Sequence, residues 1–358
     1  MIAEPLVLQA FRQPHSIKAL KLADWDLLIR QARRCNLLSS LQVMLDENDL
    51  LDSVPPQPRE HLEWARIGAE RHTQAVRWEV GHIVKALDGL GIPVMLLKGA
   101  AYVFAQLPAG RGRIFNDIDI LVPEAHLGAV EASLMLHGWV SLHTDAYDQR
   151  YYRTWMHELP PMQHVKRETV IDVHHAIVPK TAPVHPDSAL LLAAALPVDG
   201  TRSLTVLAPH DMLLHSAVHL FNDGEFDNGL RDLVDLHRLI THFSQSPSFW
   251  PGLVPRAIQL QLSRPLFYAL RYTRQLLDTP IPDDVMDAAE AGHPDRAMLA
   301  LMDQLFTRAL VPNHASCTDA LTGTAKEMLY VRANWLRMPP LLLARHLFHK
   351  AFISPRNK

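Results

Sequence analysis

The sequence predicts an α+β protein, in which a short region of strands and helices lies between two helical regions. Apolar residues before residue 90 recur at three- and four-residue steps, which is typical of amphipathic helices. Between 93 and 177, short apolar and β-branched runs alternate with helical stretches, and beyond Pro179 almost no strand pattern remains. We therefore expect an N-terminal helical segment, an α/β core and a C-terminal helical domain, at 1–89, 90–180 and 181–358.

Two helices are expected before the first strand. One covers 24–47, where Trp25, Leu28 and Ala32 share a face. The other follows a proline-rich break at 53–58 and covers 59–90, because Gly91 offers a stop and Pro93 prevents continuation.

The middle of the chain combines strands with helices. The apolar run 93–97 is too short for a helix and predicts a buried strand, after which Gly99 opens a helix. The segment NDIDILVP alternates acidic and apolar residues, which indicates a strand. A helix is then expected at 124–137, followed by strands at 139–142, 151–156 and 169–177.

The remainder is expected to be helical. Proline-containing breaks separate these helices, which are expected at 187–196, 210–222, 227–243, 252–278, 294–310, 318–335 and 340–353. From Arg332 onward, basic residues lie among apolar ones. We interpret this pattern as a solvated face over a core stripe, the alternative being a surface for membrane or nucleic acid.

Composition limits the classes of function. The 358 residues exceed what one core usually serves, and 48% hydrophobic with 20% charged residues exclude a disordered chain. Since 35 Lys and Arg stand against 38 Asp and Glu, no global positive charge attracts nucleic acid, and a nucleic-acid partner is the less expected one. The two cysteines, Cys35 and Cys317, are far apart, which excludes a disulfide framework and a thiolate zinc site.

The terminal and apolar segments predict the location of the protein. The first residues include Glu4 and lack a basic region followed by an apolar core, so they do not resemble a signal peptide. The longest apolar run, 189–198, is far shorter than the roughly 20 residues of a spanning helix. We expect a cytoplasmic protein without a transmembrane segment.

A group of acidic residues predicts metal chemistry. Asp117 and Asp119 are two residues apart on a strand, so their carboxylates share a face with Cα atoms about 6.5–7 Å apart. Pairs of Mg²⁺ ions held by carboxylates clamp phosphate oxygens in many enzymes. Such a pair is also common in ordinary strands with exposed acids. A third acid on another strand, Asp172, favours the metal site, as does the strand-to-helix turn Lys98-Gly99, whose backbone N–H groups can approach phosphate.

Four segments resemble a known family. LLKGAAYVFAQ, RIFNDIDILVP, VIDVHHAI and HSAVHLFNDGEFDNGLRDLVDLHRLI are similar to the nucleotidyltransferases of the DNA polymerase β superfamily, within the group of uncharacterised nucleotidyltransferases. The resemblance covers about 25–240 and implies a small mixed β-sheet core. It implies transfer of a nucleoside monophosphate from an NTP, with ATP as the expected donor, and release of pyrophosphate. The chain has Gly99-Ala100 where the superfamily usually has Gly-Ser or Gly-Gly, and its gap to the first acid is longer.

The resemblance also implies roles for the acids and their neighbours. Asp117 and Asp119 would hold both Mg²⁺ ions, with Mn²⁺ as an alternative, and Asp172 would hold the ion that activates the nucleophile. Lys98 either pairs with phosphate oxygens or lies on the surface, and Arg113 either reaches the triphosphate or braces Asp117. The expected nucleotide-binding residues are Lys98, Gly99, Ala100 and Arg113.

An acceptor pocket is expected from residues beyond the acids. His174 shares the face of Asp172, and His215 and His219 are four apart on a helix, where lining or structural roles are favoured over zinc because no Glu intervenes. Arg231 and Asp235 form either an exposed i,i+4 pair or part of the cleft. The expected acceptor is a hydroxyl of a small molecule, saccharide or protein. The alternatives are RNA or a toxin partner as acceptor, and a degenerate module that only binds nucleotide.

Overall fold

The computed structural model describes residues 4–143, 145–198 and 204–344. Its strands form one mixed sheet, which confirms the α+β class. The order across the sheet is β3 (Trp139–Ser141), β4 (Met162–His164), β5 (Val170–His174), β2 (Asp117–Leu121), β1 (Val94–Leu96), β7 (Leu204–Val206) and β6 (Leu196–Pro197). β2 is parallel to β5 and β1 is parallel to β7, while the other neighbouring pairs are antiparallel.

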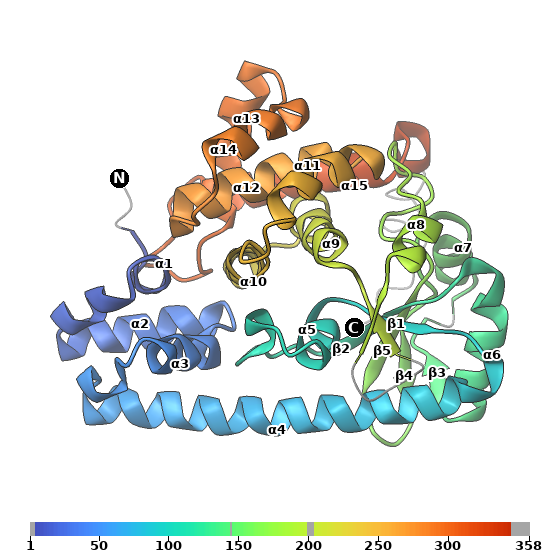
Figure 1. The fold of residues 1–358 in the computed structure, drawn as a ribbon, viewed down its shortest axis with the longest axis horizontal. Helices are drawn as coiled ribbons and strands as arrows, with labels where there is room; N and C mark the ends of the chain where they lie inside the picture. Colours follow the sequence, from blue (N-terminus) through green and yellow to red (C-terminus); the bar gives the residue numbers. More distant parts are fainter. Residues whose placement is uncertain (1–3, 144, 199–203, 345–358) are drawn as a thin grey trace.

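The N-terminal helices are α1 (Leu6–Arg12), α2 (Leu22–Arg34), α3 (Leu38–Glu47) and α4 (Pro56–Leu87). α4 runs along one side of the molecule, with α2 and α3 packed on its first half and α6 on its second (Figure 1). The single helix expected at 24–47 is wrong, because the chain turns after α2. Asn36 takes a left-handed conformation with φ of 53°, and the Leu37 N–H donates back to the Ala32 carbonyl at 2.9 Å.

Three helices accompany the central strands, namely α5 (Lys98–Phe104), α6 (Leu127–Leu136) and α7 (Ala146–Trp155). The strand expected at 151–156 is wrong, since this segment belongs to α7. The Asp145 side chain accepts hydrogen bonds from the N–H groups of Tyr147 and Asp148 and so caps the helix. This cap outweighs the strand preference of the aromatic residues.

Most of the remaining chain is helical. Its helices are α8 (Ser188–Ala193), α9 (Pro209–Asn222), α10 (Gly229–Phe243), α11 (Phe249–Gln259), α12 (Ser263–Leu277), α13 (Asp283–Ala289), α14 (Arg296–Ala309) and α15 (Thr322–Arg337). The expectation of almost no strands beyond Pro179 is wrong, because β6 and β7 extend the sheet next to β1. The helix expected at 252–278 is divided by Gln261, which has φ of 59°. Most of the helix expected at 340–353 lies outside the described residues.

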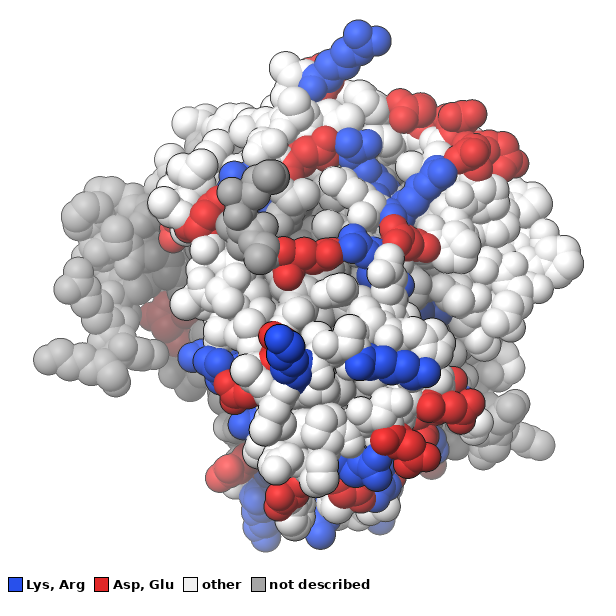
Figure 2. Space-filling view, turned by 90° about the vertical axis from the view of Figure 1, so that its left-hand side faces the viewer, with Lys and Arg blue, Asp and Glu red and all other residues white. Residues whose placement is uncertain are grey.

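Short 3₁₀ turns complete the chain path, at Pro14–Ala19, Leu51–Ser53, Asp88–Leu90, Pro108–Gly110, Glu124–His126 and Glu290–Gly292. No helix among the described residues is long and apolar enough to cross a membrane. Figure 2 shows acidic and basic side chains intermixed on the face in view, in keeping with the small net charge of −3.

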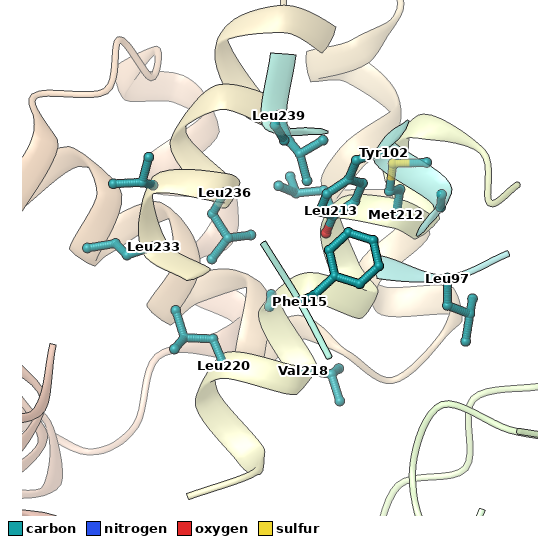
Figure 3. Close-up of a cluster of buried hydrophobic side chains, with 14 of the residues drawn as sticks. Leu97, Tyr102, Phe115, Met212, Leu213, Val218, Leu220, Leu233, Leu236 and Leu239 are labelled. Carbon is teal, nitrogen blue, oxygen red and sulfur yellow. The ribbon is translucent and has the colours of Figure 1, made fainter. Parts of the chain in front are cut away.

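A buried apolar cluster joins the sheet to the C-terminal helices. Tyr102 of α5 and Phe115, just before β2, pack close to Leu213 of α9 and Leu236 of α10 (Figure 3). Burying a side chain of this size contributes about 1.5–3 kcal/mol. The cluster therefore fixes the adjoining ends of β1 and β2 relative to α9 and α10.

Candidate active site

The three predicted acids meet on the sheet. Asp119 of β2 and Asp172 of β5 are register partners, and Asp117 lies two residues before Asp119 on the same strand. Each contributes a carboxylate oxygen to a group whose atoms all lie within 4.8 Å of one another. The prediction that the acids converge from two strands is confirmed, and the group is able to hold a metal ion.

The three carboxylates differ in their electrostatic surroundings. Burial, together with the charges of Asp119 and Glu158, raises the pKa of Asp172 to about 7. Burial and the neighbouring Asp119 charge also raise the pKa of Asp117. Burial opposes ionisation of Asp119 too, but the Lys98 ammonium and a hydrogen bond from His174 keep its pKa well below the usual range. One oxygen of Asp172, Oδ1, is buried without a hydrogen-bond partner.

Lys98 supplies the positive charge next to the acids. Its Nζ donates to Asp119 Oδ1 at 2.9 Å, and its side chain is 19% exposed. Burial disfavours the ammonium, yet the Asp119 carboxylate raises the pKa of Lys98 overall. The residue begins α5 with a left-handed φ of 45°, and the adjacent Leu97 N–H donates to the Asp119 carbonyl at 3.0 Å. The prediction that Lys98 lies on the surface is therefore wrong. Its alternative, a pairing with phosphate oxygens, stays a prediction.

Gly99 and Ala100 follow Lys98 and are buried. A Cβ at Gly99 would lie 2.5 Å from Arg113 Nη1 and 2.6 Å from Phe115 Cδ1. Close packing against these two side chains therefore explains the glycine, whereas the sequence suggested an approach to phosphate.

Arg113 pairs with acids of α10, whereas the sequence predicted that it would brace Asp117 or reach the triphosphate. Its Nε donates to Asp235 Oδ2 at 2.6 Å, and its guanidinium lies 5.5 Å from the ring centroids of both Tyr102 and Phe115. Arg231 donates instead to Asp232 Oδ1 at 2.9 Å. Arg231 and Asp235 thus form neither an exposed pair nor a part of the cavity next to the acids, and both are buried.

A cavity of about 350 Å³ adjoins the acids. Lys98 and His174, which both bond to Asp119, form part of its wall. His215 and His219 of α9 also line it, and burial lowers the pKa of His215 to about 3 and that of His219 well below its usual range. Three of the five residues expected in an acceptor pocket therefore share one cavity.

The cavity contains residues that the sequence did not single out. Arg332 and Arg337 of α15 line the cavity, and His157 lines it together with His174. Arg332 donates to the Phe221 carbonyl at 2.6 Å, and Arg337 donates to the Asp223 carbonyl at 2.7 Å. The basic C-terminal pattern was a signal for these arginines, but its period alone does not show that they face inward.

Glu158 is a further residue that the sequence did not identify. Its Oε2 lies 3.3 Å from His174 Nδ1, and its backbone forms an isolated β-bridge with His174. His174 is therefore located between two carboxylates, since its Nε2 lies 2.9 Å from Asp119 Oδ1. The pair His157-Glu158 follows α7 directly, and no spacing rule in the sequence connects it with Asp172.

Comparison with known proteins supports the resemblance. A family model described as an uncharacterised nucleotidyltransferase matches residues 21–278. No curated protein and no protein of known structure matches the chain. The matched segment includes the three acids, Lys98 and His174, whereas Arg332 and Arg337 lie beyond it.

Proposed function

The chain belongs to the family of uncharacterised nucleotidyltransferases, and from this we propose that it transfers a nucleoside monophosphate from an NTP to an acceptor hydroxyl and releases pyrophosphate. We propose ATP as the donor. The acceptor would be a small molecule, a saccharide or a protein side chain. The observation that carries the proposal is the convergence of Asp117, Asp119 and Asp172.

The acids fit a divalent metal. Carboxylate oxygens are the ligands that Mg²⁺ prefers, and Mn²⁺ accepts the same donors. The buried, unpartnered Oδ1 of Asp172 is a free acceptor at the site. We propose that Asp117 and Asp119 hold two ions and that Asp172 holds one of them. When bound, Mg²⁺ would neutralise phosphate charge and align the triphosphate.

The protein side chains would orient the reactants and accept a proton. The acceptor oxygen attacks the α-phosphorus, a new P–O bond forms, and the bond to the β-phosphate oxygen breaks. We propose that Asp172 accepts the hydroxyl proton, because it lies opposite Asp119 in the strand pair and its Oδ1 has no hydrogen-bond partner. Lys98, which is next to Asp119, would pair with phosphate oxygens as they arrive.

The cavity is the proposed acceptor site. Its volume of about 350 Å³ suits a small molecule or a side chain rather than a polymer. Apolar residues such as Val218 and Tyr268 line it. Among the described residues of its wall, the cations Lys98, Arg264, Arg332 and Arg337 outnumber the acid Asp223. These charges favour an acceptor with an anionic group.

A second candidate function is nucleotide binding without transfer. Asp119 Oδ1 already accepts from both Lys98 and His174, which competes with metal coordination. A degenerate site would retain these bonds in the presence of nucleotide and Mg²⁺.

Calorimetry tests the proposed site. A non-hydrolysable ATP analogue should bind with Mg²⁺, and its affinity should fall at least about 100-fold without Mg²⁺ or in the double variant Asp117→Asn, Asp119→Asn. Asp52→Asn is the matched control, because Asp52 is fully exposed and remote in sequence from the acids. If the double variant binds the analogue with Mg²⁺ as tightly as the natural protein, Asp117 and Asp119 are not the metal ligands. Consumption of ATP and release of pyrophosphate across an acceptor panel then separate transfer from binding alone.

A further inference from the structure

We propose that His157, Glu158 and His174 form a separate site for a divalent transition metal of the zinc type. This site lies beside the three aspartates and is distinct from their Mg²⁺ site. The proposal goes beyond nucleotidyl transfer, and its test needs neither nucleotide nor acceptor.

The three side chains present a donor set suited to zinc. Two imidazole nitrogens and one carboxylate oxygen lie within 4.8 Å of one another. Zn²⁺ binds such ligands at about 2.0–2.2 Å, so tetrahedral ligand atoms lie roughly 3.3 Å apart. Small side-chain rotations would close the observed group to that spacing. Imidazole also favours zinc over Mg²⁺, which requires oxygen ligands.

The backbone holds the donors in place before any ion binds. Glu158 and His174 are bridge partners, and the Leu159 N–H donates to the Val173 carbonyl at 2.9 Å. The His157 carbonyl accepts from the His175 N–H, also at 2.9 Å. A segment that follows α7 is thus fixed along the end of β5, and metal binding would require little ordering of the chain.

The contact of His174 Nε2 with Asp119 leaves the other ring nitrogen, Nδ1, for a metal ion. His174 Nε2 lies 2.9 Å from Asp119 Oδ1, within hydrogen-bond distance of that carboxylate. The other ring nitrogen, Nδ1, faces Glu158 Oε2 at 3.3 Å. This Nδ1 is buried without a hydrogen-bond partner, and His174 is 3% exposed. Metal-binding histidines commonly donate their other N–H to a carboxylate in this way.

His157 supplies the second free donor. Its Nδ1 is also buried without a hydrogen-bond partner. The His157 and His174 rings lie 5.2 Å apart between centroids, and both line the cavity. Three protein ligands leave one position of a tetrahedral zinc site open, and here that position would be accessible from the cavity.

Zinc titration of the metal-free, untagged full chain tests the proposal. We expect one Zn²⁺ per chain and a tetrahedral absorption spectrum when Co²⁺ replaces it. His157→Gln and Glu158→Gln should each lower zinc affinity at least about 100-fold, because each removes a ligand. His215→Gln is the matched control, since it removes another buried cavity histidine outside the group. Asp117→Asn is the second control and shows whether zinc binds to the three aspartates instead.

The outcomes are distinct. Loss of zinc in His157→Gln and Glu158→Gln, with affinity unchanged within about threefold in both controls, supports the site. No stoichiometric zinc on the folded chain overturns it and indicates that a proton lies between His174 and Glu158. Loss of zinc in Asp117→Asn alone also overturns it. Circular dichroism in EDTA identifies variants that fail to fold, and Glu158→Gln keeps the test decisive if His157→Gln does not fold. Mg²⁺-dependent nucleotide binding is measured separately, so failure here leaves the proposed function untouched.

Discussion

Asp119 on β2 and Asp172 on β5 lie opposite each other in a parallel strand pair, so two carboxylates share one face of the sheet. Lys98 and His174 both bond to Asp119. Among the described residues, no cation bonds to Asp172 Oδ1, which is buried and unpartnered. The cost of holding several buried negative charges without a metal therefore falls mainly on Asp172.

The first prediction concerns pH and stability. Asp172 has a pKa of about 7 in the folded chain, against about 3.9 in an unfolded one, so the folded state holds an extra proton between these values. Below about pH 4 the Asp172 carboxyl is protonated in both states and costs no stability. As pH rises through about 7, its buried charge progressively lowers the free energy of unfolding. In EDTA at pH 8, Asp172→Asn should therefore raise Tm by about 2–4 °C. The difference should shrink at pH 5.

Calorimetric melting from pH 5 to 8 checks this prediction. Asp52→Asn is the control, because its fully exposed side chain should give no pH-dependent difference. Saturating Mg²⁺ should reverse the order at pH 8, since only the intact acid group binds the ion tightly. A variant less stable than the natural protein at pH 8 in EDTA would contradict the charge crowding.

The second prediction concerns Lys98. Lys98→Met leaves the buried Asp119 carboxylate without its ammonium partner, and removal of one partner of a buried pair costs about 3–5 kcal/mol. We expect this loss in urea unfolding with EDTA present. Mg²⁺ should restore more stability to the variant than to the natural protein, because the ion replaces the missing charge. Equal stabilisation by Mg²⁺ would show that Lys98 does not neutralise the metal site.

The third prediction separates a brace of α10 by Arg113 from a contact between Arg113 and the triphosphate. Arg113→Met leaves Asp235 buried without its partner and should lower the free energy of unfolding by about 3 kcal/mol. The double variant Arg113→Met, Asp235→Leu removes both charges and should recover more than half of that loss. A brace predicts that ATP-analogue affinity in the folded double variant stays within about threefold of the natural protein. A much larger loss of affinity would instead make Arg113 a nucleotide ligand.

The sequence predicted the helices and strands with long, clear periods, and failed at several helix ends. Asn36 and Gln261 both adopt left-handed conformations that turn the chain between helices. Glycine usually occupies such positions, so two helix pairs appeared continuous in the sequence. β7 has three residues, and its pairing with β1 depends on long-range contacts that no local pattern reports.

The acids of the candidate site were predictable because each lies in a strand that the sequence pattern shows. Asp117 and Asp119 are close in sequence, and Asp172 was recognisable as an acid within an apolar strand. His157 and Glu158 were not, because a bridge to β5 brings them to the site from an irregular segment. Arg113 was placed by the family resemblance either at the triphosphate or beside Asp117. Its partner Asp235 is 122 residues away, a distance that spacing cannot resolve.

The last prediction tests whether packing explains the glycine after Lys98. A methyl group at Gly99 would overlap Arg113 Nη1 and Phe115, so Gly99→Ala should destabilise the chain by about 1–3 kcal/mol. Gly68 offers a matched control, because it is exposed on α4 with nothing within 4 Å of an added methyl group, and Gly68→Ala should stabilise by about 0.5–1 kcal/mol. Urea unfolding of both variants should thus give changes of opposite sign. If Gly99→Ala instead keeps full stability but loses binding of the ATP analogue, the glycine serves phosphate approach, as the sequence first suggested.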